Sequence, residues 1–164
     1  MRKRSDEVCN YLAPDRRSNA VDDRSFETFV NYSVLLHTIE SVKTAVKEAH
    51  RERGVCGEAL VSARVTQLYD DGACVYFYYI MDASGLADGK KVYNEIEAVA
   101  RETILECGGS ISHHHGVGKH RAKYVGRGEG ERSGAALIAK ATKEAVDPKN
   151  TFGVRNGVFS VVEE

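Results

Sequence analysis

The sequence predicts an α+β fold of the ferredoxin-like type, in which helices pack on one face of an antiparallel sheet. Two segments repeat apolar residues at helical spacing, and two β-rich runs are separated by an Asp-Gly step typical of a hairpin. Further short strand-like runs precede the first helix and follow the second, so the order is β-α-β-β-α-β. With 164 residues, of which 42% are hydrophobic, the chain can bury one core.

The first strand is expected at Ser25–Val30, where apolar and polar residues alternate. Residues 1–24 are mostly charged or small, without periodicity, which is typical of a tail or linker. The first helix follows, and we expect Ser33 to cap it and Gly54 to end it. Its apolar stripe recurs at steps of three and four: Leu35, Ile39, Val42, Val46 and Ala49.

The hairpin is predicted from the runs 59–69 and 73–81, with Asp70-Asp71-Gly72 as the turn. A second helix is predicted to end at Gly108-Gly109. It is indicated by the stripe Val92, Ile96, Val99, Thr103 and Cys107.

A short fourth strand is expected at Ser110–Ser112, after the second helix. Beyond a glycine-rich loop, a third helix is predicted near residues 135–146, ending before Asp147-Pro148.

The composition excludes several classes of protein. A net charge of −1 provides no basic field for nucleic acid, so no nucleic-acid partner is expected. No apolar run approaches the length of a membrane span. The four cysteines form no CxxC pair, which argues against zinc and for a reducing compartment. We therefore expect a soluble, intracellular domain.

Four of the six histidines lie in residues 108–125, and His113, His114 and His115 are consecutive. In an extended segment alternate side chains share a face, so one metal ion would take at most two of these three, and no metal site is predicted. GVGK is not a Walker A loop, because His113 and His120 stand where that loop needs glycine and a hydroxyl. Histidines serve proton transfer near neutral pH, so the segment is either a catalytic site or a solvated loop.

Alternation along the second hairpin strand places Tyr76 and Tyr78 on one face, while Phe77 and Tyr79 face the core. The hydroxyl of Tyr76 could act as an acid or base if nearby cations lower its pKa. Arg64 is a candidate neighbour, although the sequence does not fix the hairpin register.

Three segments resemble the C-terminal part of the alkyldihydroxyacetonephosphate synthase family, flavoproteins of ether-lipid synthesis in the vanillyl-alcohol-oxidase-like superfamily. They are SARVTQLYDDGACVYFYY (62–79), GGSISHHHGVGKHR (108–121) and DPKNTFGVRN (147–156). The resemblance implies that residues 25–164 form an FAD-linked oxidase-like cap domain whose sheet covers the flavin. It also implies that the domain binding most of FAD is absent from this chain, which alone is expected to be inactive.

The family exchanges the acyl chain of acyl-dihydroxyacetone phosphate for a long-chain alcohol, using FAD without net redox change. By resemblance, Tyr76 moves the proton on the reacting carbon. His113, His114 and His115 are implied to activate the alcohol and to stabilise charge.

Four further residues are the candidates for substrate or cofactor binding: Arg64, Arg16, Arg155 and Asn156. The family's substrate-binding arginine aligns nearest to Ala13-Pro14, so Arg16 lies a few residues away.

The resemblance further implies a peroxisome or related organelle, contact of the full enzyme with a membrane surface, and a homodimer. Three alternatives are a cap domain of an FAD-linked D-2-hydroxy-acid dehydrogenase, a non-catalytic ferredoxin-like remnant and a metal-binding module. The dehydrogenases typically carry Gly-Glu-His-Gly, with which this chain shares only His115 and Gly116.

Overall fold

The computed structural model describes residues 21–125 and 134–152. The chain divides into two compact units, Met1–Gly109 and Ser110–Glu164. Each unit is built around its own elements.

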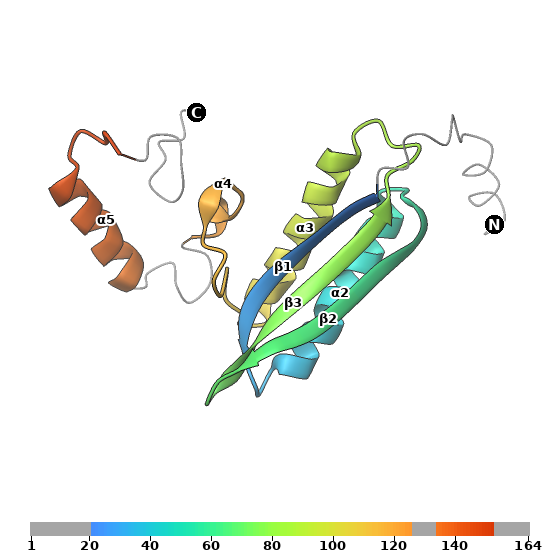
Figure 1. The fold of residues 1–164 in the computed structure, drawn as a ribbon, viewed down its shortest axis with the longest axis horizontal. Helices are drawn as coiled ribbons and strands as arrows, with labels where there is room; N and C mark the ends of the chain where they lie inside the picture. Colours follow the sequence, from blue (N-terminus) through green and yellow to red (C-terminus); the bar gives the residue numbers. More distant parts are fainter. Residues whose placement is uncertain (1–20, 126–133, 153–164) are drawn as a thin grey trace. The chain divides into compact units, whose positions relative to one another are not determined.

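The first unit is a three-stranded antiparallel sheet with two helices on one face (Figure 1). The strands are β1 (Val21–Asn31), β2 (Cys56–Leu68) and β3 (Gly72–Asp82), in the order β1-β3-β2. The helices are α2 (Leu35–Glu52) and α3 (Gly89–Glu106). The predicted fold class is confirmed, and β1 begins four residues earlier than expected.

The second unit contains the four-residue helix α4 (Gly118–Arg121), the 3₁₀ turn η1 (Ala122–Tyr124) and helix α5 (Gly134–Val146). The prediction of α5 is confirmed, whereas α4 and η1 were not expected. The predicted strand at Ser110–Ser112 is wrong, because these residues form a bend rather than a ladder. Within the described residues the sheet therefore has three strands instead of four.

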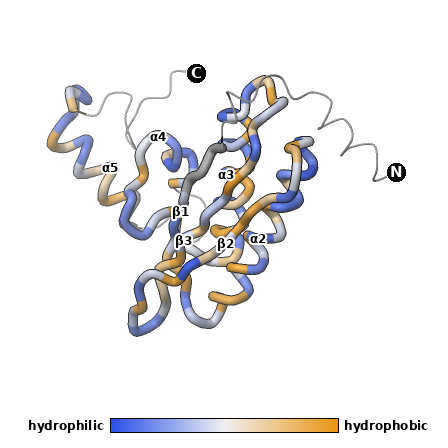
Figure 2. The backbone as a smooth tube through the Cα atoms, turned by 45° about the vertical axis from the view of Figure 1, so that its right-hand side comes forward, coloured by the Kyte–Doolittle hydropathy of each residue, from blue (hydrophilic) through white to orange (hydrophobic). Residues whose placement is uncertain are grey.

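The core of the first unit lies between β3 and the two helices. Alternate residues of β3 are buried on the helix side: Ala73, Val75, Phe77, Tyr79 and Met81. Along α2 and α3 hydrophobic and hydrophilic residues alternate, as Figure 2 shows, so each helix buries one stripe. The stripe of α2 has Val42, Val46 and Ala49 at its centre, as predicted.

The buried face of α3 is rotated by about one residue from the predicted stripe. Its centre is Tyr93, Ile96, Ala100 and Ile104, while the predicted Val92, Val99, Thr103 and Cys107 are only partly buried. Tyr93 stacks on Tyr79 with ring centroids 5.2 Å apart, and this large aromatic pair sets the rotation of the helix.

The ends of the helices follow local hydrogen-bonding rules. Gly54, with φ +66°, ends α2 as predicted: its N–H donates to Arg51 O, and Val55 N–H donates to His50 O. The prediction that Ser33 caps α2 is wrong, since its backbone N–H and its hydroxyl both donate to Asn31 Oδ1. Asp88 caps α3 by accepting from Lys91 N–H at 2.9 Å.

The β2–β3 turn is closed by a hydrogen bond from Tyr69 N–H to Gly72 O at 2.8 Å, with Asp70 and Asp71 between them. Gly72 is required for space, because a Cβ at this position would meet the carbonyl oxygen of Val30 and the ring of Phe29. The close approach of β1 to the start of β3 therefore depends on this glycine.

We predict that Gly72→Ala destabilises the first unit by about 1–3 kcal/mol, because the added methyl overlaps the β1 backbone. Urea unfolding followed by circular dichroism measures the change. The matched control is Asp71→Ala in the same turn, which is exposed and is expected to alter the free energy of unfolding by about 0.5 kcal/mol or less. Equal effects of the two substitutions would contradict the steric explanation.

A histidine–tyrosine pair is buried in the core. His50 is 2% exposed, and its Nδ1 lies 2.8 Å from the hydroxyl of Tyr79, while its Nε2 lies 3.2 Å from Gly57 O. A carbonyl only accepts, so Nε2 carries the proton and Nδ1 accepts from Tyr79. Burial lowers the pKa of His50 below its ordinary value of 6.5, and the Gly57 carbonyl opposes this.

We predict that the first unit loses stability as the pH falls below 6.5. Below this pH His50 binds a proton in the unfolded chain but remains neutral in the folded one, because its folded pKa is lower. The contribution of neutral His50 to stability is therefore complete above pH 6.5 and is lost as the pH falls towards the pKa of folded His50. One proton gives a slope of at most about 1.4 kcal/mol per pH unit. Urea unfolding of His50→Gln should show a flatter dependence in this range. His37→Gln, on the exposed side of α2, should keep the wild-type slope, and the same slope in both variants would exclude His50 as its source.

The described cysteines differ in state. Cys74 is a buried free thiol and Cys107 a half-buried one, whereas Cys56 is disulfide-bonded. The bonded Cys56 departs from the expectation of reduced cysteines.

No helix among residues 21–125 and 134–152 is long and apolar enough to cross a membrane.

Candidate functional site

The face of the sheet opposite the helices carries the predicted tyrosines. Tyr76 and Tyr78 occupy alternate positions of β3 on this open face, as expected, together with Cys74 and Ile80. Their rings stack with centroids 6.1 Å apart and planes inclined by 25°. The prediction that Phe77 and Tyr79 belong to the core is confirmed, since both are fully buried.

Tyr76 is the middle member of a polar row across all three strands. It lies opposite Glu27 on β1 and opposite Arg64 on β2. Directly opposed residues of antiparallel strands place their side chains on the same face, with Cβ atoms about 4.5–5.5 Å apart. The sheet therefore brings a carboxylate, a phenol and a guanidinium together, and Arg64 is the neighbour of Tyr76 that the sequence suggested.

The electrostatics of Tyr76 differ from the expectation. Burial raises the pKa of its phenol, and Cys74, Glu27 and Tyr78 raise it further in that order. Arg64 is exposed, so water screens its charge and it does not offset these effects. The predicted lowering of the pKa by cations is therefore wrong, and Tyr76 is a neutral phenol at neutral pH.

Glu27 is a member of this row that the sequence reasoning missed. Its side chain is 0% exposed, which is rare for a glutamate. The sequence did contain a signal for the position of Glu27. Because side chains alternate along a strand, the residue between Phe26 and Thr28 lies on the face opposite the core, which is the face of Tyr76.

The three consecutive histidines lie in the second unit and do not form an extended segment. Residues 113–115 make a bend, so the expected placement of His113 and His115 on one face does not apply. Neighbouring rings pack edge to face instead, with centroids 5.0 Å apart for His113–His114 and 4.6 Å for His114–His115.

His113 Nδ1 and His114 Nδ1 are 2.8 Å apart, within hydrogen-bonding distance. One of these nitrogens donates and the other accepts, so the bond exists only while one ring lacks a proton at Nδ1. Arg121 closes the loop by donating from Nη1 to Gly116 O at 2.7 Å. The chain turns at Gly116, whose φ is +75°. The two rings of the loop therefore share one hydrogen bond.

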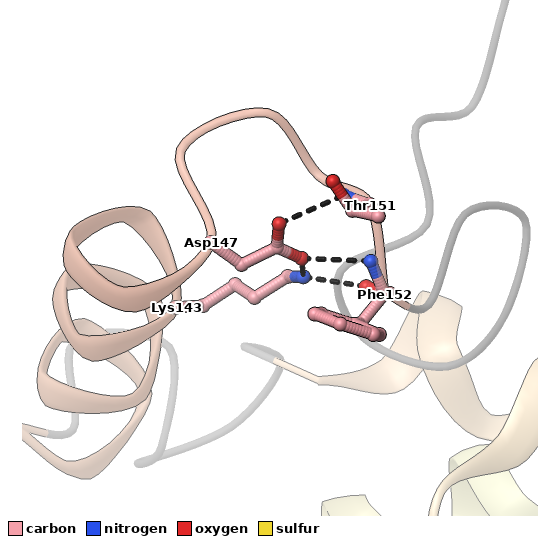
Figure 3. A network of polar contacts seen from close by, with 4 residues as sticks. All are labelled: Lys143, Asp147, Thr151 and Phe152. Carbon is pink, nitrogen blue, oxygen red and sulfur yellow. Dashed lines mark hydrogen bonds and ion pairs between the residues drawn. The ribbon is translucent and has the colours of Figure 1, made fainter.

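The segment after α5 is organised by the carboxylate of Asp147 (Figure 3). This carboxylate accepts from Thr151 N–H at 2.8 Å, from Phe152 N–H at 2.9 Å and from the Lys143 ammonium, which also donates to Phe152 O. The Lys143 hydrogen bond, followed by that of Phe152 N–H, lowers the pKa of Asp147 to about 2. Sequence reasoning identified Asp147 only as a helix stop.

We predict that the turn at residues 147–152 opens in acid. Folded Asp147 titrates below its ordinary pKa of 3.8, so its contribution is complete above pH 3.8 and is lost as the pH falls through about 2. Amide hydrogen exchange at Thr151 and Phe152 should accelerate in that range. Asp147→Asn should show fast exchange already at neutral pH, whereas Glu144→Gln, an exposed change on α5, should not. Slow exchange in Asp147→Asn would show that the carboxylate does not hold the turn.

The remaining predicted binding residues, Arg16, Arg155 and Asn156, lie outside the described residues. Arg64 is thus the candidate binding residue whose position is known. In the first unit, Arg64 lies opposite Tyr76. In the second unit, the three histidine rings pack against one another.

Comparison with known proteins defines the class of this chain. Residues 13–155 match the family of FAD linked oxidases, C-terminal domain. The chain belongs to this family, and the three-stranded sheet with its open face is part of such a domain.

The chain is similar to alkyldihydroxyacetonephosphate synthase. The protein of Caenorhabditis elegans is 44% identical over 146 residues, which cover 89% of this chain and 24% of that protein. The protein of Trypanosoma brucei brucei is 34% identical over 127 residues, 76% of this chain and 20% of that protein. A solved structure of alkyldihydroxyacetonephosphate synthase shares the fold, with a TM-score of 0.54 at 21% identity over 87% of this chain and 21% of that one. The chain thus spans about a quarter of its relatives' length or less.

Proposed function

We propose that this chain is the cap portion of a flavin-dependent transferase of ether-lipid synthesis. The reaction replaces the acyl group of acyl-dihydroxyacetone phosphate by a long-chain alcohol. The observation that carries the proposal is the row Glu27–Tyr76–Arg64, which sets an acid–base group between a buried carboxyl group and an exposed guanidinium on the sheet face opposite the helices. Identity of 44% with the synthase of Caenorhabditis elegans supports the choice of reaction.

The open face fits contact with a flavin. The stacked rings of Tyr76 and Tyr78 offer a flat aromatic surface with hydroxyl edges, and Arg64 offers a planar cation suited to phosphate. FAD would supply the covalent chemistry at the reacting carbon, without net redox change. The phosphates of FAD would be held by the part of the relatives that this chain does not span.

Each residue of this chain has a proposed role. Tyr76 removes the proton of the reacting carbon in its tyrosinate form and, as the phenol so formed, returns the same proton to that carbon. Arg64 binds the substrate phosphate as a planar, permanently charged donor. The shared proton of His113 and His114 suits them to accept the proton of the incoming alcohol, with His115 packed against His114.

We further propose that the complete enzyme acts in a peroxisome or related organelle, contacts a membrane surface to collect its long-chain substrates, and forms a homodimer.

The function is tested in a chimera in which the 146 aligned residues of this chain replace their counterparts in the Caenorhabditis elegans synthase. The chimera should bind FAD and incorporate a labelled long-chain alcohol into the alkyl product. Tyr76→Phe in the chimera should lower the rate by a factor of about 10²–10⁴, the usual contribution of a general acid–base group, while FAD stays bound.

The matched control is Tyr78→Phe, which removes a hydroxyl from the same strand face and should leave most of the activity. Full activity of Tyr76→Phe would remove the proton-transfer role. Oxidation of a D-2-hydroxy acid by the chimera, without alcohol incorporation, would instead identify a dehydrogenase.

A further inference from the structure

We propose that the apolar side of α5 is a docking surface for the flavin-binding part of the complete enzyme, the part of its relatives that this chain does not span. The three consecutive histidines belong to the same compact unit as α5, so this contact anchors the unit that contains them. The identity of the partner rests on the proposed function. The exposure of the helix is a property of this chain alone.

The apolar side of α5 is open to solvent. Its apolar side chains recur at steps of three and four and therefore share one side of the helix: Leu137, Ile138, Ala141 and Ala145. Leu137 is 62% exposed and Ile138 is 68% exposed, and Val146 at the end of the helix is 75% exposed. Within the part of the chain that the structure describes, no element covers this side.

The polar side of α5 is instead the side that contacts the rest of the unit. The Lys143 ammonium donates to the Asp147 carboxylate and to Phe152 O, which folds the segment after the helix against this side (Figure 3). The Lys143 side chain is only 17% exposed as a result. A surface helix normally buries its apolar side, and a helix of 13 residues is marginally stable in water without packing. The exposed side therefore indicates a partner.

The size of the helix argues against a second copy of this chain as that partner. Thirteen residues make a helix about 20 Å long and about 10 Å wide, so one side offers a footprint of about 200 Å². Two such footprints amount to about 400 Å², whereas stable association of separate chains buries about 1,200–2,000 Å². A partner within the same chain needs less area, because the covalent connection provides a high effective concentration.

The relatives contain such a partner. The family match over residues 13–155 includes α5, and the matched residues make up 24% of the Caenorhabditis elegans synthase, which leaves about three quarters of that protein outside the match. A lipid surface fits α5 less well, because helices that lie on membranes bury large side chains such as Trp, Phe and Leu. Alanines at positions 139, 141 and 145 instead allow another backbone to approach closely.

The test is hydrogen exchange of the α5 backbone amides, measured by mass spectrometry in this chain and in the chimera with the Caenorhabditis elegans synthase. Exchange should be at least roughly 10-fold slower in the chimera, because burial of one large aliphatic side chain stabilises by that factor or more. Ile138→Asp in the chimera should abolish the protection. The matched control is Lys140→Asp, which places the same residue on the polar side of the helix and should keep it.

Two further measurements guard against simple unfolding. In this chain alone, Ile138→Asp should leave the urea unfolding of the first unit unchanged. In the chimera, the milder Ile138→Ala should give an exchange rate between those of the parent and of Ile138→Asp.

Equal exchange rates in the chain and in the chimera, or equal effects of the two aspartate variants, overturn the proposal. Slow exchange in the chain alone that sets in with rising protein concentration assigns the surface to a second copy and also overturns it. Slow exchange on addition of phosphatidylcholine vesicles does the same in favour of lipid. Protection of α5 in a chimera that incorporates no alcohol supports the docking surface while the proposed function fails. Incorporation without protection supports the function and refutes the docking surface.

Discussion

Strand β3 is the element on which both faces of the first unit depend. It is the central strand, and it hydrogen-bonds to β1 along one side and to β2 along the other. Its alternate residues either fill the core under α2 and α3 or stand on the open face. Since side chains alternate strictly, the fully buried Phe77 and Tyr79 leave Tyr76 and Tyr78 only the opposite face. The demands of packing thus position the residues of the candidate site.

Each face of β3 contains a tyrosine that neighbours other ionisable residues. On the core side, Tyr79 donates to His50, and burial keeps both groups uncharged at neutral pH. On the open side, Tyr76 lies opposite Glu27 and Arg64. The Tyr79–His50 hydrogen bond satisfies buried polar atoms and so contributes to stability. The row around Tyr76, in contrast, contains ionisable groups that can act on a ligand. Placement on a paired central strand gives the second site a rigid support.

Sequence periodicity was sufficient to predict the helices and strands that bury one apolar face in the core. The stripe of α2, the hairpin and the two faces of β3 were predicted because apolar spacing reflects the side that meets the core. The prediction of a cap at Ser33 failed because Asn31 Oδ1 accepts hydrogen bonds from both the backbone N–H and the hydroxyl of Ser33. The prediction of a strand at Ser110–Ser112 failed because so short a run does not specify a pairing partner. The bend at the histidines could not be predicted, since glycines permit many backbone paths.

The irregularity of β2 between Val65 and Gln67 has a consequence for how this site is compared among proteins. Near the turn, Leu68 pairs with Ala73 and Gln67 with Cys74, and a regular ladder continued from there would set Arg64 opposite Phe77. The extra residue, Thr66, shifts the pairing so that Arg64 meets Tyr76 instead. One bulged residue therefore selects the face on which the guanidinium stands. A homologue with a hairpin one residue shorter would carry the same arginine in an alignment and yet lack it in the site.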